Sequence, residues 1–205
     1  MTRRWLALLL PLALSGCGYN KIQTLDEQAN AAQGQIEVQL QRRADLIPNL
    51  VETVKGFAKQ ELDVLTNVTR ARAGLVDAIQ KGDPEQMANA NDALTAQLAI
   101  VNRSVVEAYP ELKSNEQFLR LQDELTGTEN RIAVSRQDYN EAVNRYNAYI
   151  RKFPANITAR VTGAGARKYF TASSGAQTAP TVDFNTAPGG GAGTTQPAAG
   201  TGTAR

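Results

Sequence analysis

The chain has 205 residues, of which 42% are hydrophobic and 20% charged, and its formal net charge is +2. This composition suits one ordinary domain with a buried core. The sequence contains no histidine and a single cysteine, which excludes a Ser-His-Asp triad, a Cys-His dyad, a histidine-ligated metal and an internal disulfide. We therefore predict that the protein is not an enzyme and that it has no cofactor and no metal site.

Residues 1–16 have the features of a secretory signal peptide. Arg3 and Arg4 precede ten apolar residues, Trp5–Leu14, as the basic and apolar regions of export signals do. A membrane-spanning helix needs about 20 apolar residues, so this stretch is too short to remain as a span. Removal of the two arginines leaves equal numbers of basic and acidic residues, so the charge balance predicts no nucleic-acid partner.

The single cysteine ends the stretch Leu14-Ser15-Gly16-Cys17, which resembles a bacterial lipobox. In that motif the thiol is linked to diacylglycerol before cleavage, so residues 17–21 would form a lipidated N-terminus. Several acyl chains, palmitate among them, would then hold the protein firmly at a membrane. An ordinary signal or a short anchor with a lone thiol is the alternative. Gly18 follows the cysteine, which by the usual sorting rule favours the outer membrane facing the periplasm, with inner-membrane anchoring as the alternative.

Residues 22–153 follow the three- and four-residue apolar spacing that is typical of amphipathic helices. Short breaks with proline, glycine and aspartate separate four helical segments, as helix start and stop signals do. The segments are Ile22–Leu40, Asn49–Lys81, Met87–Ala108 and Ser114–Phe153. Because short connections place neighbouring helices antiparallel, the sequence predicts an all-α fold, an elongated antiparallel up-down four-helix bundle.

The first of these breaks lies at Pro48, between Asp45 and Asn49. Proline suits the first position of a helix and disrupts a helix interior, so we expect a turn here. The alternative is a kink within one continuous helix. That helix would be roughly 90 Å long and would outrun its partners.

The helical pattern ends at Phe153. Residues 154–170 mix apolar, glycine and basic residues, and we expect an irregular segment that either folds back on the bundle or extends from it. Residues 171–205 are rich in glycine, alanine, threonine and proline, and we expect a disordered tail because they cannot bury enough apolar surface. Within the tail, Ala179–Phe184 is either a docking strand or an incidental pair of hydrophobic residues.

Two long stretches of the sequence, Gln41–Phe57 and Leu121–Asn140, resemble the LemA family of bacterial envelope proteins. The early Gly18-Tyr19-Asn20 and the late Phe153-Pro154 also match, and the resemblance covers Gly18–Phe170. It implies an elongated helical bundle and no established catalytic site. Typical members carry an uncleaved N-terminal membrane helix, from which the lipobox departs. LemA-like genes often lie near genes for envelope proteases or TPM-domain proteins, which implies a role with a partner.

Several carboxylates lie on the fourth helical segment, where helix spacing could place two of them within reach of a glycosidic bond. Glycoside hydrolysis needs two carboxyl groups about 5 to 9.5 Å apart across a cleft, and an antiparallel bundle rarely forms one. A solvated face with local ion pairs is therefore the favoured interpretation. The Glu-x-x-His pairs of bundle metal sites and the calcium-binding loop motif are both absent from the sequence.

Two groups of polar residues are candidates for interaction. The group at the predicted first turn contains Arg42, Arg43, Asp45, Asn49 and Glu52. The group on the fourth segment contains Glu129, Asn130, Arg131, Asp138, Tyr139 and Asn140. We expect the first group to lie at the end of the bundle that also holds the connection near Pro110. Either a polar network that ties helix ends together or a surface that recognises a partner would explain these residues.

The leading hypothesis is a non-enzymatic, lipid-anchored envelope protein that serves as a scaffold or interaction module for another, unidentified envelope protein. The second hypothesis is a regulator or adaptor of an envelope protease or hydrolase, with the tail as its contact. The third and least favoured is a carboxylate-dependent wall hydrolase. The sequence shows no motif for a small-molecule substrate or a nucleotide.

Overall fold

The structure, a computed structural model, describes residues 2–58 and 60–171. Every regular element in this part of the chain is a helix, which confirms the predicted all-α class. The elements are α1 (Thr2–Phe57), α2 (Leu62–Lys81), α3 (Pro84–Ile100), the π-helical η1 (Val101–Val105), α4 (Val106–Ala108), α5 (Pro110–Lys113), α6 (Glu116–Ile150) and α7 (Ala155–Thr162).

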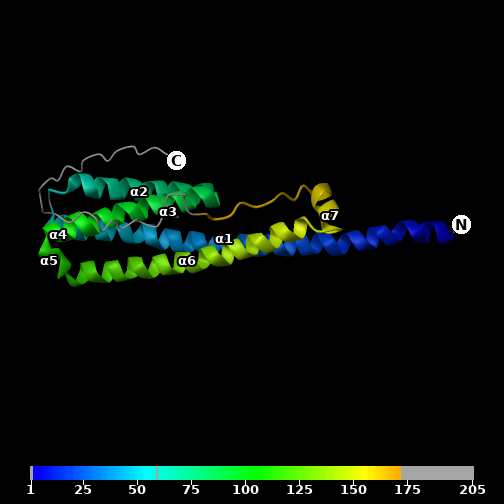
Figure 1. Ribbon diagram of the computed structural model, residues 1–205, viewed down its shortest axis with the longest axis horizontal. Coiled ribbons are helices and arrows are strands. Elements are labelled where there is room, and N and C mark those ends of the chain that lie inside the picture. Colours follow the sequence, from blue (N-terminus) through cyan, green and yellow to red (C-terminus); the bar gives the residue numbers. More distant parts are fainter. Residues whose placement is uncertain (1, 59, 172–205) are drawn as a thin grey trace, which may run out of the picture.

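The two longest helices, α1 and α6, lie side by side and run in opposite directions along the molecule (Figure 1). The antiparallel pair α2 and α3 covers one half of them and completes an elongated up-down bundle. We call this half the four-helix region; it contains residues 33–57 of α1, α2 to α4 and residues 116–138 of α6. The narrower half, which we call the stalk, contains residues 18–32 of α1, residues 139–150 of α6 and α7.

The connections between α2, α3 and α6 follow the predicted stop and start signals. Gly82 ends α2 in the left-handed conformation at φ +66°, and its N–H bonds the carbonyls of Ala78 and Ile79, as glycine at a helix C-terminus does. The Asp83 carboxylate then caps α3 by accepting from two backbone N–H groups. Asn115 caps α6 by accepting from the N–H of Phe118.

The predicted turn at Pro48 is wrong, because α1 continues through this residue to Phe57. Proline lacks the N–H that would bond the carbonyl of Ala44, one turn earlier. The Nε of Arg72 on α2 donates to that carbonyl at 2.8 Å. Ile47 and Leu50, on either side of the proline, are buried in the core. The neighbouring helix therefore replaces the lost hydrogen bond, and core packing keeps α1 helical as far as Phe57; α2 begins at Leu62.

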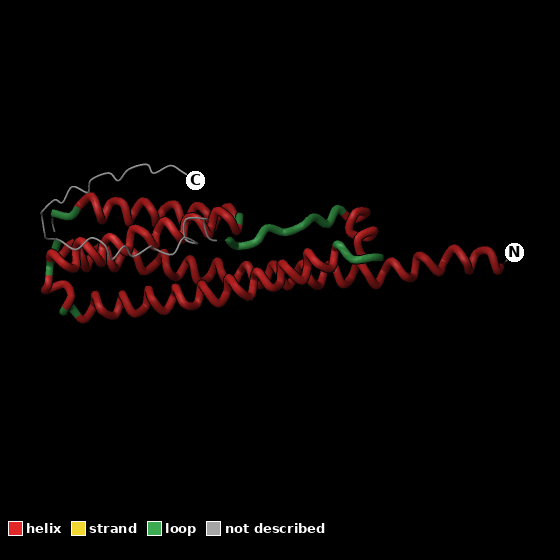
Figure 2. Tube along the Cα trace, viewed as in Figure 1, coloured by secondary structure: helices red, strands yellow, loops and turns green. Residues whose placement is uncertain are grey.

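The segment after Phe153 is more ordered than we expected. Residues 155–162 form α7, which folds back against α1 and α6, and it ends at Gly163 with φ +72°. The following residues, 163–171, extend along the bundle toward the connection between α2 and α3 (Figure 2). We call them the strap. The remaining tail, with the stretch Ala179–Phe184, lies outside the described residues.

The first part of α1 includes the predicted signal peptide. Over residues 2–17 the structure describes the backbone alone, which is helical. Among the residues that the structure describes, no helix is both long and apolar enough to cross a membrane. The lipidation of Cys17 and the cleavage before it stay predictions.

Candidate functional site

A buried arginine joins three helices in the four-helix region. Arg43 of α1 is 1% exposed and is the largest fully buried side chain among the described residues. Its Nη1 donates to Oδ1 of Asn91 on α3 at 2.7 Å, and its Nη2 lies 3.6 Å from Oε2 of Glu129 on α6. Its Nε is buried without a hydrogen-bond partner. One guanidinium therefore connects α1, α3 and α6.

The positive charge of Arg43 is buried and is partly compensated by nearby carboxylates. Burial lowers the pKa of the Arg43 guanidinium, while the carboxylates of Glu129 and Asp92 act in the opposite direction. An arginine stays protonated in proteins because its ordinary pKa is so high. Since an uncompensated buried charge costs several kcal/mol, Arg43 makes the fold depend on its partners on the other two helices.

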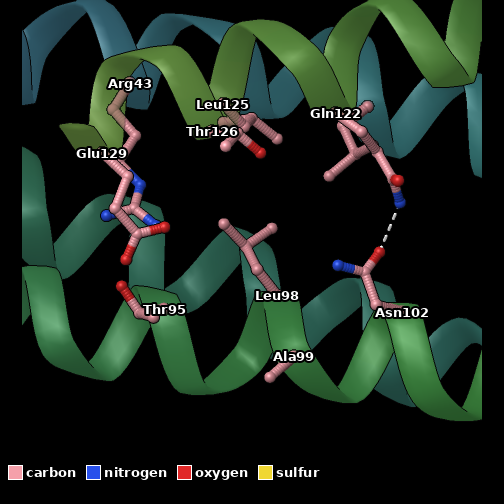
Figure 3. Close-up of a pocket in the computed structure, with 10 residues that line it drawn as sticks. Arg43, Thr95, Leu98, Ala99, Asn102, Gln122, Leu125, Thr126 and Glu129 are labelled. Carbon is pink, nitrogen blue, oxygen red and sulfur yellow. Dashed lines mark hydrogen bonds and ion pairs between the residues drawn. The ribbon is translucent and has the colours of Figure 1, made fainter. Parts of the chain in front are cut away.

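A cavity of about 220 Å³ opens beside Arg43 and Glu129, between α3 and α6 (Figure 3). At the opposite end of the cavity, Gln122 of α6 donates to Oδ1 of Asn102 on η1. Its lining also includes Leu50, Thr95, Leu98, Ala99, Leu125 and Thr126. Glu129 is the one carboxylate in this lining, so the pair of carboxyl groups that glycoside hydrolysis requires is not present here. In the described residues no group of three or more Cys, Asp or Glu side chains could hold a metal ion.

A second polar site lies on the stalk, where two asparagines of α6 hold the backbone of the strap. Asn147 donates to the carbonyl of Arg167 and accepts from its N–H, at 3.0 and 2.8 Å. Asn140 makes the same pair of bonds with Phe170, at 3.0 and 2.8 Å. Each carboxamide thus satisfies one backbone donor and one acceptor, as a neighbouring β-strand would.

The spacing of the two asparagines fits an extended chain. They lie seven residues apart on α6, which is about 10.5 Å at the rise of an α-helix. The strap residues that they hold, Arg167 and Phe170, lie three residues apart, which is about 10 Å in an extended chain. The hydroxyl of Tyr139 adds a third bond, to the carbonyl of Lys168 at 2.9 Å. The surface therefore holds an extended backbone at three points.

Side chains of the strap complete the attachment at both ends. Phe170 is buried in the core. Arg167 donates to Asp26 of α1 at 2.7 Å, and this hydrogen bond raises the pKa of the arginine. Lys168 contacts Asp83 at 2.8 Å. That hydrogen bond raises the pKa of the lysine and is the main cause of a lowered pKa at Asp83. The strap thus connects α1 with the cap of α3.

The structure corrects the predicted position of the first polar group. Because Pro48 does not end the helix, these residues lie along α1, and the end of α1 that meets Pro110 is at Phe57. Arg43 alone among them is buried. The exposed members of the group are Arg42, Asp45, Asn49 and Glu52. Two of these exposed residues take part in local side-chain hydrogen bonds, Asp45 with Gln41 and Glu52 with Lys55.

The residues of the second group divide between the two regions. Glu129 meets Arg43, and Arg131 donates to Gln39 of α1 at 3.1 Å. Tyr139 and Asn140 hold the strap. Exposed positions are occupied by the other two members, Asn130 and Asp138. The structure therefore brings Glu129 to Arg43 of the first group and places Tyr139 and Asn140 at the strap.

Other residues of the two sites were missed by the sequence analysis. Asn91 and Arg167 are far from their partners in the sequence, and no local pattern marks them. The seven-residue spacing of Asn140 and Asn147 was a usable signal, because it places both carboxamides on the same face of α6.

The fold and these sites define an elongated helical-bundle protein in which polar side chains connect the helices and hold an extended segment. The LemA family model matches residues 32–184, and the chain belongs to the LemA family. This finding confirms the resemblance seen in the sequence.

Three relatives show how the chain compares with individual proteins. It is 30% identical over 177 residues to magnetosome protein MamQ 2 of Paramagnetospirillum magneticum, in an alignment that covers 74% of this chain and 64% of that protein. Magnetosome protein MamQ of Magnetospirillum gryphiswaldense is 28% identical with the same coverage. Protein LemA of Metamycoplasma hominis is 22% identical over 142 residues, which cover 69% of this chain and 63% of that protein. The chain thus spans somewhat less than two thirds of the length of these relatives.

Proposed function

We propose that this LemA-family protein is a non-enzymatic scaffold of the bacterial envelope, held at a membrane through lipidated Cys17. One observation carries this proposal: a single helix, α1, connects the predicted anchor directly to the core of the four-helix region. Cleavage before Cys17 would leave residues 17–57 of this helix, and these 41 residues correspond to about 62 Å at the rise of an α-helix. A continuous, laterally braced helix of this length suits a rigid spacer that presents a surface at a fixed distance from the membrane.

The proposal that the protein is not an enzyme rests on the residues that it contains. The sequence has no histidine, and the carboxylate in the cavity, Glu129, is paired with the buried Arg43. The names of the MamQ relatives place those proteins in magnetosomes. We propose that the present protein likewise works as part of a larger assembly, in the outer membrane facing the periplasm or, as the alternative, at the inner membrane.

An exposed groove between α1 and α6 supports a contact with a partner protein. It has a volume of about 330 Å³ and contains two of the predicted interaction residues, Asn130 and Arg131. Its lining further includes Gln39, Val134 and Ser135. Val134 is 61% exposed, and the nearby α1 carries the exposed Val38. Exposed aliphatic residues beside an amide and a guanidinium are a suitable surface for another protein.

Crosslinking in cells tests the scaffold. A photoreactive amino acid replaces Val134, and the matched control carries it at Leu62, which is equally exposed on α2. The expected result is one crosslinked product of defined mass from position 134 and none from position 62. Identical products from both positions, or recovery of the monomer alone from both, would contradict a specific contact at the groove.

Mass spectrometry of the mature N-terminus tests the anchor. We expect an acylated Cys17 as the first residue, and Cys17→Ala should leave an unprocessed or soluble chain. An unmodified cysteine in the natural chain would refute lipidation. The partner contact at the groove would still be tested by the crosslinking experiment.

A further inference from the structure

The helix α7 packs in an unusual orientation, with its small apolar residues inside and its large ones outside. Ala155 and Ala159 are buried, each 4% exposed, against the stalk. Phe153, immediately before the helix, is 80% exposed, and Ile157 and Val161 are 54% and 83% exposed. A surface helix ordinarily turns its larger apolar side chains toward the core. The reversed packing of α7 leaves these large apolar side chains exposed among the residues that the structure describes.

Two of the large residues share a face of α7, because Ile157 and Val161 lie four residues apart in the helix. Phe153 precedes the helix and adds a third exposed apolar side chain at its start. We call these three residues the α7 stripe. Contiguous exposed apolar surface on a soluble chain marks a site of contact with a protein or a membrane.

The charged residues that neighbour the α7 stripe in the sequence are all basic. Arg151, Lys152 and Arg160 are exposed beside it. Between Glu141 and Asp183 the sequence contains no acidic residue at all. Basic side chains next to an apolar stripe complement the phosphates of anionic lipids, and this composition is typical of helices that lie in the membrane interface.

The position of α7 in the fold points to the same occupant. The helix packs on α1 beside Gly18, where a Cβ would lie 3.4 Å from Oγ1 of Thr158. Gly18 directly follows Cys17, and the apolar stretch Trp5–Leu14 ends four residues before it. Figure 1 shows α7 at the end of the bundle from which the N-terminal part of α1 continues, far from α4 and α5. The α7 stripe therefore lies where the proposed anchor would meet the membrane.

We propose that the α7 stripe, with Arg151, Lys152 and Arg160, is a second membrane-binding site that contacts an anionic phospholipid surface. This inference rests on the proposed attachment at the N-terminal end and adds a site that does not depend on acylation. The large apolar residues enter the boundary between head groups and acyl chains, and the basic residues contact lipid phosphates. A single N-terminal attachment leaves an elongated bundle free to pivot, whereas a second contact fixes its tilt.

A fluorescent label tests this site on the full chain. In a Cys17→Ser background, Val161→Cys provides one thiol for an environment-sensitive NBD dye, and Val134→Cys is the matched control on α6. Both valines are exposed, so neither change disturbs the core. On addition of phosphatidylcholine vesicles that contain phosphatidylglycerol, we expect a blue shift and a severalfold rise in fluorescence at position 161 and no change at position 134. Brominated lipids should quench the label at position 161.

A charge-reversal variant sharpens the test. Arg151→Glu, Lys152→Glu and Arg160→Glu together should abolish the response at position 161. A label at position 161 that responds no more than the control, on vesicles to which the chain demonstrably binds, would overturn the proposal and favour a protein as the occupant of the stripe. That outcome would leave the anchor standing. Conversely, a response at position 161 together with an unmodified Cys17 in the natural chain would remove the lipid anchor and keep the α7 site.

Discussion

The four-helix region and the stalk are built on the same two long helices, α1 and α6, but different elements pack on these helices in each region. In the four-helix region, α2 and α3 supply apolar side chains that close a continuous core around α1 and α6. In the stalk this core thins out, and a separate, smaller cluster contains the buried residues Ile22, Leu25, Tyr146, Ile150 and Ala159. Here carboxamides and ion pairs fasten the strap along the helices. Two helices alone bury few side chains between them. The strap therefore packs on α1 and α6 beyond the end of the α2 and α3 pair.

This contrast predicts that the largest loss of stability follows a change in the four-helix region. Arg43→Ala removes a buried side chain that contacts Asn91 and Glu129 and leaves a cavity in its place. We expect a loss of about 2 to 5 kcal/mol in the free energy of unfolding, as for other large buried side chains changed to alanine, measured by urea denaturation. The matched control is Arg42→Ala, at an exposed position, with an expected change within about 0.5 kcal/mol. Equal effects of the two changes would contradict the role of Arg43 as the connection of three helices.

In the stalk we expect a smaller and local effect. Asn147→Ala leaves the N–H and the carbonyl of Arg167 without their partner, at a cost of about 1 to 3 kcal/mol. Hydrogen exchange should show roughly 10- to 100-fold faster exchange at the Arg167 amide, with little change in the amides of α2 and α3. Asn144→Ala, on the exposed side of α6, is the control. Loss of protection throughout the bundle would show that the stalk and the four-helix region unfold as one unit.

The bond from Arg72 to Ala44 predicts a coupling between two positions in different helices. Arg72→Ala should cost about 1 to 2 kcal/mol in the natural chain, because the carbonyl beneath Pro48 loses its donor. In a Pro48→Ala background the helix regains its own N–H donor, so the same change should cost less. A double-mutant cycle by chemical denaturation measures the difference. Additive effects of the two changes would mean that Arg72 stabilises α1 in some other way.

The smallest expected effect concerns pH. Contact with Lys168 lowers the pKa of Asp83 in the folded state, so its contribution is complete above the ordinary carboxyl pKa and is lost as the pH falls through the lowered value. The protection of the strap amides should therefore decrease on acidification below about pH 4. Asp83→Asn keeps a capping side chain and removes the charge, so it should flatten this dependence. An unchanged profile would exclude the pair of Asp83 and Lys168 as its cause.

The sequence predicted the parts of the fold that local pattern determines. Apolar spacing indicated the long helices, and Gly82-Asp83-Pro84 marked a turn, because the residues that cap a helix are close in sequence. Pro48 misled the prediction because its compensating donor, Arg72, is on another helix. Arg43 and Glu129 were both candidates, yet their pairing depends on the register of α1 against α6, which no local pattern specifies. The strap was missed because its partners are side-chain carboxamides rather than another strand.

Asn140 and Asn147 hydrogen-bond the strap backbone at two points a fixed distance apart. Seven helical residues and three extended residues cover nearly the same length, so both carboxamides engage in one alignment of the two chains. A shift of the strap by one residue would break the hydrogen bonds of both asparagines together. With one residue added between Arg167 and Phe170, either asparagine could keep its hydrogen bonds while the other loses them. The backbone bonds of the two asparagines therefore specify the number of residues between Arg167 and Phe170.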